Sequence, residues 1–317
     1  MKPRLFIFSI IALCAFSCSK QAHEVSNTKG VRLTLEASGT AVTKTTYVDN
    51  AETKVLAVNW EATEKISVIS IGTDGITAID EFTSTGEAGR EVAVFSGSWT
   101  GNEGDKVICL YPAVSTQTGI RLFTGATVGS TEIILKKFYG SVSNNSAELL
   151  KNFDVLLGDV NISGADAYVK LSRQIEVFRV TFTPSQLLHS DGDSETATGV
   201  TVSVTMGGVN AAIATKGTLK STLSTYTGQF KPVEYGNVKY DIGRIRYSED
   251  PYTIYLPIFS SGNLRSGQVL KFIISGDVRY YCSLPDKDVP LRIISKTLAN
   301  DLPLEKGKIY NILPFAI

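Results

Sequence analysis

The chain has little of the chemistry on which metal proteins depend. Its 317 residues include only two histidines and four cysteines. His23 lies in a polar stretch near the N-terminus and His189 in a polar loop, and no Cys/His cluster has the spacing of a zinc site. The acidic run Asp191–Glu195 lacks the twelve-residue ligand pattern of an EF-hand. We interpret it as a solvated turn, with a calcium site as the alternative, and expect no metal and no cofactor other than covalent lipid.

Sequence patterns for nucleophilic catalysis and for nucleic-acid binding are also missing. There is no Gly-x-Ser-x-Gly turn, and a serine triad would have to use His189. No aromatic pattern marks a glycosidase cleft beside paired carboxylates. Lys plus Arg and Asp plus Glu both total 31, so the chain carries no excess of positive charge for phosphates. We therefore predict that the protein is not an enzyme and does not bind nucleic acid.

Long hydrophobic runs are absent except at the N-terminus. Lys2 and Arg4 precede the apolar run Leu5–Phe16, which is shorter than the ~20 residues that a membrane-spanning helix needs. The small residue Ser17 follows, and Cys18 comes directly after it. A basic start, an apolar run and a small residue before the cleavage position are the parts of a secretory signal. The sequence therefore predicts that residues 1–17 are a signal peptide for export.

The cysteine at this position adds a lipid anchor to the prediction. Ala15-Phe16-Ser17-Cys18 resembles the lipobox of bacterial lipoproteins, with Ala15 where Leu is usual. The resemblance implies cleavage between Ser17 and Cys18, with diacylglyceryl and N-acyl lipid on Cys18. Several acyl chains at ~0.8 kcal/mol per buried CH₂ give a stable membrane anchor. No Asp adjoins Cys18, which favours the outer membrane, and residues 18–30 are polar and suit a flexible tether.

The pattern of the remaining chain predicts strands separated by turns. Short apolar runs alternate with Gly, Asp and Asn clusters, as in β-sandwiches and barrels. Val31–Glu36 is one such strand, with its apolar residues on one face. Only brief stretches, residues 147–152 and 185–189, suit a helix. We predict an all-β fold in two domains, residues 31–163 and 164–317. Cys109 and Cys282 lie in apolar segments of different domains, and we expect buried, unpaired thiols.

Several short motifs occur in an order that resembles the fimbrillin family, the lipoprotein pilins of type V fimbriae. Each motif alone is weakly specific. Trp60 and Trp99 can also be explained as aromatic residues of the core, and Gly307 as part of a turn. The resemblance rests on the order of the motifs behind the lipobox, over residues 31 to 317. The motifs are Thr43-Lys44-Thr45-Thr46-Tyr47, Trp60-Glu61-Ala62-Thr63-Glu64-Lys65-Ile66-Ser67-Val68, Phe95-Ser96-Gly97, Tyr111-Pro112 and Leu304-Glu305-Lys306-Gly307-Lys308-Ile309-Tyr310.

The resemblance implies a fold and a mode of assembly. The fold would be two tandem transthyretin-like β-sandwich domains, and the partners would be other fimbrial subunits at the bacterial cell surface. In such pilins a protease cuts after a basic residue and removes the first strand, and a neighbouring subunit donates a strand to the exposed groove. The candidate cleavage residue is Arg32, with Lys29 and Lys44 as alternatives. Arg32 could instead be a charged edge residue that faces solvent.

Two questions stay open at this level. The C-terminal strand, Ile309–Ile317, either closes its own domain or is the strand donated to a neighbour, although Pro314 interrupts its hydrogen-bond ladder. The alternative function is a monomeric outer-membrane lipoprotein that binds a glycan or a host ligand.

The lipid anchor gives a first testable expectation. Replacing Cys18 with Ala (Cys18→Ala) should abolish fatty-acid labelling and move the protein out of the membrane fraction, because the thiol is the only acceptor of the diacylglyceryl group. Cys14→Ala is the matched control and should leave labelling unchanged. Membrane association of the Cys18→Ala protein equal to that of the parent would contradict the prediction.

Overall fold

A computed structural model of the full chain describes most of the expected strands. The residues it describes are 28–38, 49–50, 55–56, 60–86, 92–115, 122–136, 140–141, 153–183, 200–207, 213–245, 251–260, 262–277 and 288–316. Several residues named above lie outside these ranges: Ser17, Cys18, His23, Lys44, His189, Asp191–Glu195 and Cys282. Within the described ranges, no helix has both the length and the hydrophobicity needed to cross a membrane.

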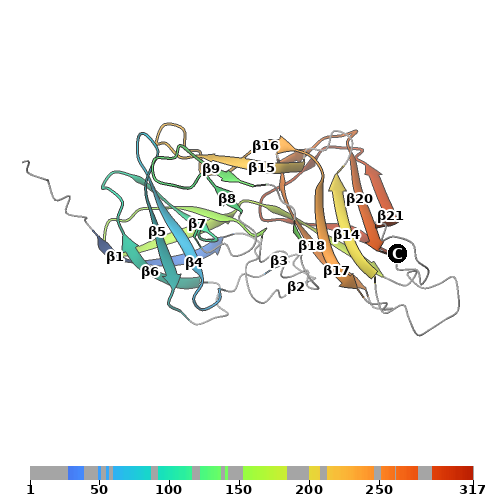
Figure 1. The fold of residues 1–317 in the computed structure, drawn as a ribbon, viewed down its shortest axis with the longest axis horizontal. Coiled ribbons are helices and arrows are strands. Elements are labelled where there is room, and N and C mark those ends of the chain that lie inside the picture. The colour runs from blue at the N-terminus through green and yellow to red at the C-terminus, as the bar shows by residue number, and fades with distance from the viewer. Residues whose placement is uncertain are drawn as a thin grey trace, which may run out of the picture.

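The first part of the fold is a sheet that closes on itself (Figure 1). Its strands are β1 (Lys29–Ser38), β4 (Lys65–Ile71), β5 (Ile76–Ser84), β6 (Val92–Trp99), β7 (Lys106–Tyr111), β11 (Leu156–Val160) and β12 (Asp166–Arg173). Around the barrel they follow the order β1-β12-β11-β7-β4-β5-β6. The strand β1 closes the barrel, because it pairs with β12 on one side and with β6 on the other.

The second part contains two larger sheets. The five-stranded sheet has the order β10 (Gly140–Ser141), β17 (Val238–Ile245), β14 (Val200–Gly207), β20 (Val269–Asp277), β21 (Asp288–Thr297). The seven-stranded sheet has the order β23 (Ile309–Ala316), β13 (Glu176–Thr183), β18 (Tyr252–Ser260), β15 (Ile213–Lys220), β9 (Glu132–Leu135), β8 (Phe123–Thr124), with β16 (Lys231–Tyr235) beside β15. Two small ladders join β2 (Asp49–Asn50) to β3 (Val55–Leu56), and β19 (Asn263–Leu264) to β22 (Leu302–Pro303).

Aromatic side chains join the two larger sheets face to face. Phe178 of β13 and Phe272 of β20 lie in an edge-on contact with ring centroids 5.9 Å apart. Both side chains are buried, in a hydrophobic cluster that also includes residues of the barrel strands, such as Ile69 and Leu110. The prediction of an all-β fold in two parts is confirmed for the described residues, and the two stretches expected to suit a helix, 147–152 and 185–189, lie outside them.

The chain passes from the barrel to the second part between Arg173 and Glu176. The strand β12, which the sequence analysis assigned to residues 164–317, pairs within the barrel. In the other direction, β8, β9 and β10 come from residues 31–163 and join the sheets of the second part. Each part therefore contains strands from both sides of position 163.

The two parts share one strand arrangement, although the sequence shows no exact repeat. In the barrel, β1 pairs parallel with β12 and antiparallel with β6. In the second part, β13 pairs parallel with β23 and antiparallel with β18. The strand β23 therefore pairs with β13 as β12 pairs with β1, and it lies at the edge of the seven-stranded sheet of its own part.

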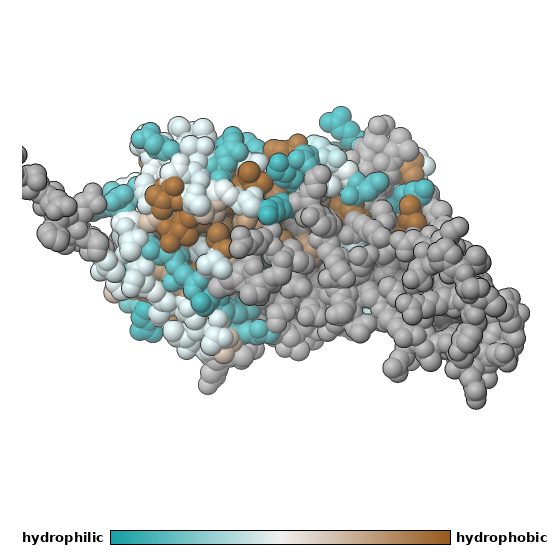
Figure 2. Space-filling view, viewed as in Figure 1, coloured by the Kyte–Doolittle hydropathy of each residue, from teal (hydrophilic) through white to brown (hydrophobic). Residues whose placement is uncertain are grey.

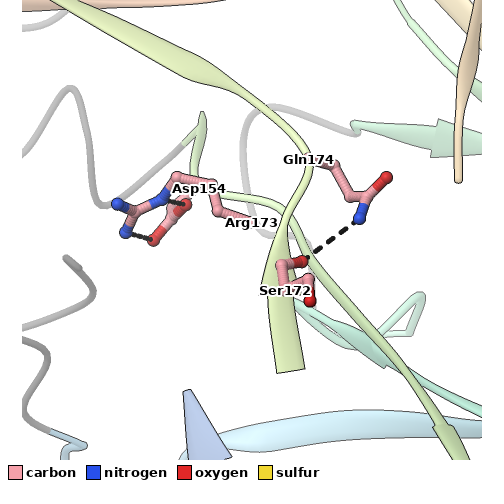
Figure 3. Close-up of polar contacts among 4 residues, drawn as sticks. All are labelled: Asp154, Ser172, Arg173 and Gln174. Carbon is pink, nitrogen blue, oxygen red and sulfur yellow. Dashed lines mark hydrogen bonds and ion pairs between the residues drawn. The ribbon is translucent and has the colours of Figure 1, made fainter. Parts of the chain in front are cut away.

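A buried ion pair fixes the point where the chain leaves the barrel (Figure 3). The Arg173 guanidinium donates from Nε to Asp154 Oδ1 at 2.6 Å and from Nη2 to Oδ2 at 2.7 Å. Both side chains are almost fully buried. On the other side of the strand, Gln174 Nε2 donates to the Ser172 carbonyl at 3.2 Å. The two-point contact holds the end of β12 in one orientation.

The Asp154–Arg173 pair should matter far more than an exposed pair. Asp154→Ala removes the buried carboxylate that balances Arg173, and we expect the free energy of unfolding to fall by about 3–5 kcal/mol. Asp166→Ala is the control, because Asp166 lies 4.0 Å from Arg32 with both side chains exposed, and its loss should cost about 0–1 kcal/mol. Urea unfolding measures both, and equal effects would contradict the prediction.

Candidate functional site

The candidate functional site is the position in the barrel that β1 fills between β6 and β12, together with the side chains that line it. We call this position the β1 seat. Val31, Leu33 and Leu35 point inward and are at most 2% exposed, while Arg32 faces solvent. The alternation read from the sequence therefore sets the orientation of the strand. Leu33 lies opposite Phe95 of β6 and Ala167 of β12. Without β1, the edges of β6 and β12 and the sites of these apolar side chains would be open.

The floor of this seat is made of aromatic rings. The Trp60 ring meets the rings of Phe95 and Tyr111 edge-on, at centroid distances of 5.2 and 5.3 Å. The Trp99 indole Nε1 donates to Ser70 Oγ at 2.9 Å, so its polar atom is satisfied inside the core. Trp60 and Trp99 are therefore core aromatics, as their plain reading predicted.

A glycine in the fimbrillin-like motif has a packing role beside β1. Gly97 lies opposite Val31 in the β1–β6 register. A Cβ atom at Gly97 would lie 2.6 Å from Cδ2 of Phe82 and 2.9 Å from the Glu81 carbonyl oxygen. Only glycine lets Phe82 pack under this position, so Phe95-Ser96-Gly97 shapes the wall of the seat.

Arg32, the candidate cleavage residue, lies inside β1. Its N–H donates to the Ala165 carbonyl at 2.7 Å, and it stands opposite Ser96 of β6 and Asp166 of β12. Lys29, the alternative, starts the strand, and its ammonium lies 5.7 Å from the centre of the Trp99 ring. The Arg32 side chain is exposed, but its main chain is paired on both sides. A protease could therefore cleave the peptide bond after Arg32 only when β1 is detached from β6 and β12.

A second polar cluster lies where the chain enters the second part. The Glu176 carboxylate is buried, and its Oε1 accepts a hydrogen bond from Ser260 Oγ at 2.8 Å. Burial raises the pKa of Glu176 to about 7, against smaller opposite effects of the Ser260 hydrogen bond and the Lys306 charge. Burial likewise lowers the pKa of Lys306, whose Nζ donates to the Phe230 carbonyl at 3.3 Å.

The Glu176–Lys306 cluster explains a motif that the sequence left as a turn. Gly307 has a φ of +80°, which only glycine adopts without strain. Its N–H donates to the Ile175 carbonyl at 2.8 Å. The Tyr310 hydroxyl accepts a hydrogen bond from the Glu305 N–H at 2.6 Å. The motif Leu304–Tyr310 thus docks the turn before β23 onto the start of β13.

Other chemistry is scarce in the described part of the chain. It contains no group of three or more His, Cys, Asp or Glu side chains that could hold a metal ion. Cys109 is a buried free thiol, as expected, and burial raises its pKa. On the part of the face in Figure 2 that is not grey, hydrophobic residues form small separate patches among polar ones.

Comparisons with known proteins give structural neighbours only. No family model matches the chain, and no curated protein matches it. A candidate cell adhesion protein from Bacteroides ovatus has a TM-score of 0.46 and 12% identity, over 92% of each chain. A fimbrial protein from Bacteroides ovatus has a TM-score of 0.37 and 11% identity, over 92% of this chain and 51% of that one. The fimbrial anchor protein Mfa2 from Porphyromonas gingivalis has a TM-score of 0.36 and 9% identity, over 87% of this chain and all of that one (100%).

The structural neighbours are thus fimbrial and cell adhesion proteins, the class that the sequence motifs led us to expect.

The raised pKa of Glu176 predicts a pH dependence. Because the folded carboxyl titrates near pH 7 and its ordinary value is 4.5, the folded state holds its proton more tightly. Stability from this group is present below pH 4.5 and is lost as the pH rises through 7. Glu176→Gln should reduce the fall in unfolding free energy between pH 5 and pH 8 by roughly 2–3 kcal/mol. Urea unfolding at both values tests this.

The control for this prediction is Glu103→Gln in an exposed turn, which should keep the pH dependence of the parent. If Glu176→Gln showed the same pH dependence as the Glu103→Gln control, the assignment to the buried carboxyl would be wrong.

Proposed function

We propose that this protein is a lipid-anchored subunit of a bacterial cell-surface fimbrium, and that β1 occupies the place of a strand donated by a neighbouring subunit. The observation that carries the proposal is the double pairing of β1 between β6 and β12, with Val31, Leu33 and Leu35 buried. A strand added there would gain two hydrogen-bonded edges and an apolar seat, which is how strand addition obtains affinity and specificity.

The chain connectivity allows β1 to be removed, whereas β13, the equivalent strand of the second part, cannot be removed without cutting the chain between the two parts. The strand β13 holds the equivalent position in the second part, but it continues directly from β12 through Gln174 and Ile175. The proposed tether and the proposed lipid site Cys18 precede β1 in the sequence. Release of β1 therefore opens the barrel without breaking the chain that joins the two parts.

The position of the cut follows from the register of β1. A cut after Arg32 frees Lys29–Arg32 but leaves Leu33 and Leu35 in their seats. Complete release requires cleavage beyond Ser38, where the first basic residue is Lys44. We therefore propose Lys44 for full removal of the strand, and Arg32 only for partial trimming. N-terminal sequencing of surface-displayed protein after trypsin-like digestion distinguishes a new start at Leu33 from one at Thr45.

Strand exchange can be tested with a peptide. A chain that starts at Gly39 should bind a peptide of residues 28–38 and unfold at higher temperature in its presence, because the peptide restores the pairs to β6 and β12. A peptide with Leu33→Asp and Leu35→Asp keeps the main chain but places charges in the apolar seat, so it should not bind. Thermal unfolding and native mass spectrometry measure both peptides.

The outcome separates the proposed function from its alternative. Equal binding of both peptides, or of neither, would contradict strand addition at this seat. Electron microscopy of cells with and without the protein then tests the fibre itself. A soluble mature protein that binds glycan, with no fibres in either case, would instead support a monomeric ligand-binding lipoprotein at the outer membrane.

A further inference from the structure

We propose that the fold is built to carry tension between its two ends, through two parallel strand pairs that are loaded in shear and connected in series. The first pair is β1 with β12, and the second is β13 with β23. The proposal rests on the proposed function and concerns the lipid-anchored subunit that still retains β1, since such a subunit at a cell surface is pulled at both ends. It adds a mechanical role for the parallel pairing that strand addition alone does not require.

The strand directions decide how a pull acts. A pull on the N-terminal side of β1 draws β1 backward, while a pull from β13 draws β12 forward. Because β1 and β12 are parallel, these forces slide the strands past each other, and all their hydrogen bonds resist together. The same holds for β13, pulled by β12, and β23, pulled at its C-terminal end. In Figure 1, β1 lies at the left end of the long axis and the C mark lies toward the right end.

The connection between the two pairs has little slack. Gln174 N–H donates to the Val155 carbonyl at 2.7 Å, and Ile175 accepts from Gly307 N–H at 2.8 Å. Arg173, just before them, is held by its two hydrogen bonds to Asp154. Force on β12 therefore passes directly to β13 rather than first extending a loose linker.

The two pairs are not equally strong. Arg32 to Ser38 pair with Asp166 to Ser172 without interruption. The β13–β23 register shifts between Val180 and Phe182, at the point where β23 contains Pro314, which has no N–H to donate. We expect β23 to slip first under load, and the β1–β12 pair to hold to a higher force.

Single-molecule pulling tests the direction dependence. The chain from Lys20 onward retains every described residue and can be pulled between its N-terminus and its C-terminus. A second geometry pulls between the N-terminus and a clickable residue in place of the exposed Asp166, which lies beside Arg32 at the same end of the β1–β12 pair. This geometry peels the pair one bond at a time. The N-to-C rupture force should be severalfold higher, and equal forces would overturn the proposal.

Two variants separate the load path from overall stability. Arg32 N–H points to β12, so by strand alternation Thr34 N–H does too, and Thr34→Pro removes that hydrogen bond. It should lower the higher of the two N-to-C rupture forces, that of the β1–β12 pair, toward the peeling value. Ile69→Ala creates a cavity beside β4, a strand that belongs to neither parallel pair. It should lower the unfolding midpoint in urea but leave the N-to-C force near that of the parent.

An N-to-C rupture force that tracks the urea midpoint across both variants would also overturn the proposal. If Thr34→Pro does not fold, the two pulling geometries of the parent still decide. The result is independent of fibre formation, because peptide exchange and microscopy test assembly while pulling tests only the resistance of the single chain.

Discussion

The continuous segment from β12 to β13 is the constraint on which the rest of the structure depends. It contributes one strand to each part, and each of its strands takes a parallel partner, β1 or β23. Parallel partners cannot be joined by a tight hairpin, so a long stretch of chain with other strands lies between β1 and β12 and between β13 and β23. Arg173, bound to Asp154, holds the segment at its midpoint. The closure of the barrel and the docking of the last strand both follow from this arrangement.

Local sequence patterns predicted the strands well, and the face of β1 in particular. Val31, Leu33 and Leu35 alternate with polar residues, and period-two alternation is a property of the strand itself. The partners of β1 could not be predicted in this way. The choice of β12 as its parallel neighbour depends on contacts between segments more than a hundred residues apart, as the pair Arg32 and Asp166 shows. A boundary placed at a polar turn therefore missed that β12 completes the barrel.

The polar parts of the structure were the least predictable. Asp154, Arg173 and Glu176 are ordinary charged residues in the sequence, and only their burial makes them distinctive. The motif that ends in Tyr310 gave a partial signal, because its glycine indicated a turn. Nothing in the motif shows that the charge of Lys306 lies near enough to Glu176 to act on its carboxylate. Such contacts come from topology, which local periodicity does not encode.

Glu176 and Lys306 lie where the turn before β23 meets the start of β13, a place that we call the joint. These buried charges set the register of β23 against β13 rather than adding stability. Burial opposes the charged form of Glu176, so an apolar residue there would often be equally stable or more stable. A purely apolar joint, however, would let β23 slide along β13, and a slip of one residue turns every side chain to the other face. The bulge beside Pro314 already weakens this pair. Lys306 held near Glu176, and Gly307 bonded to Ile175, fix the start of β23 at one position. The joint therefore trades some stability for a single alignment of the strand that ends the chain.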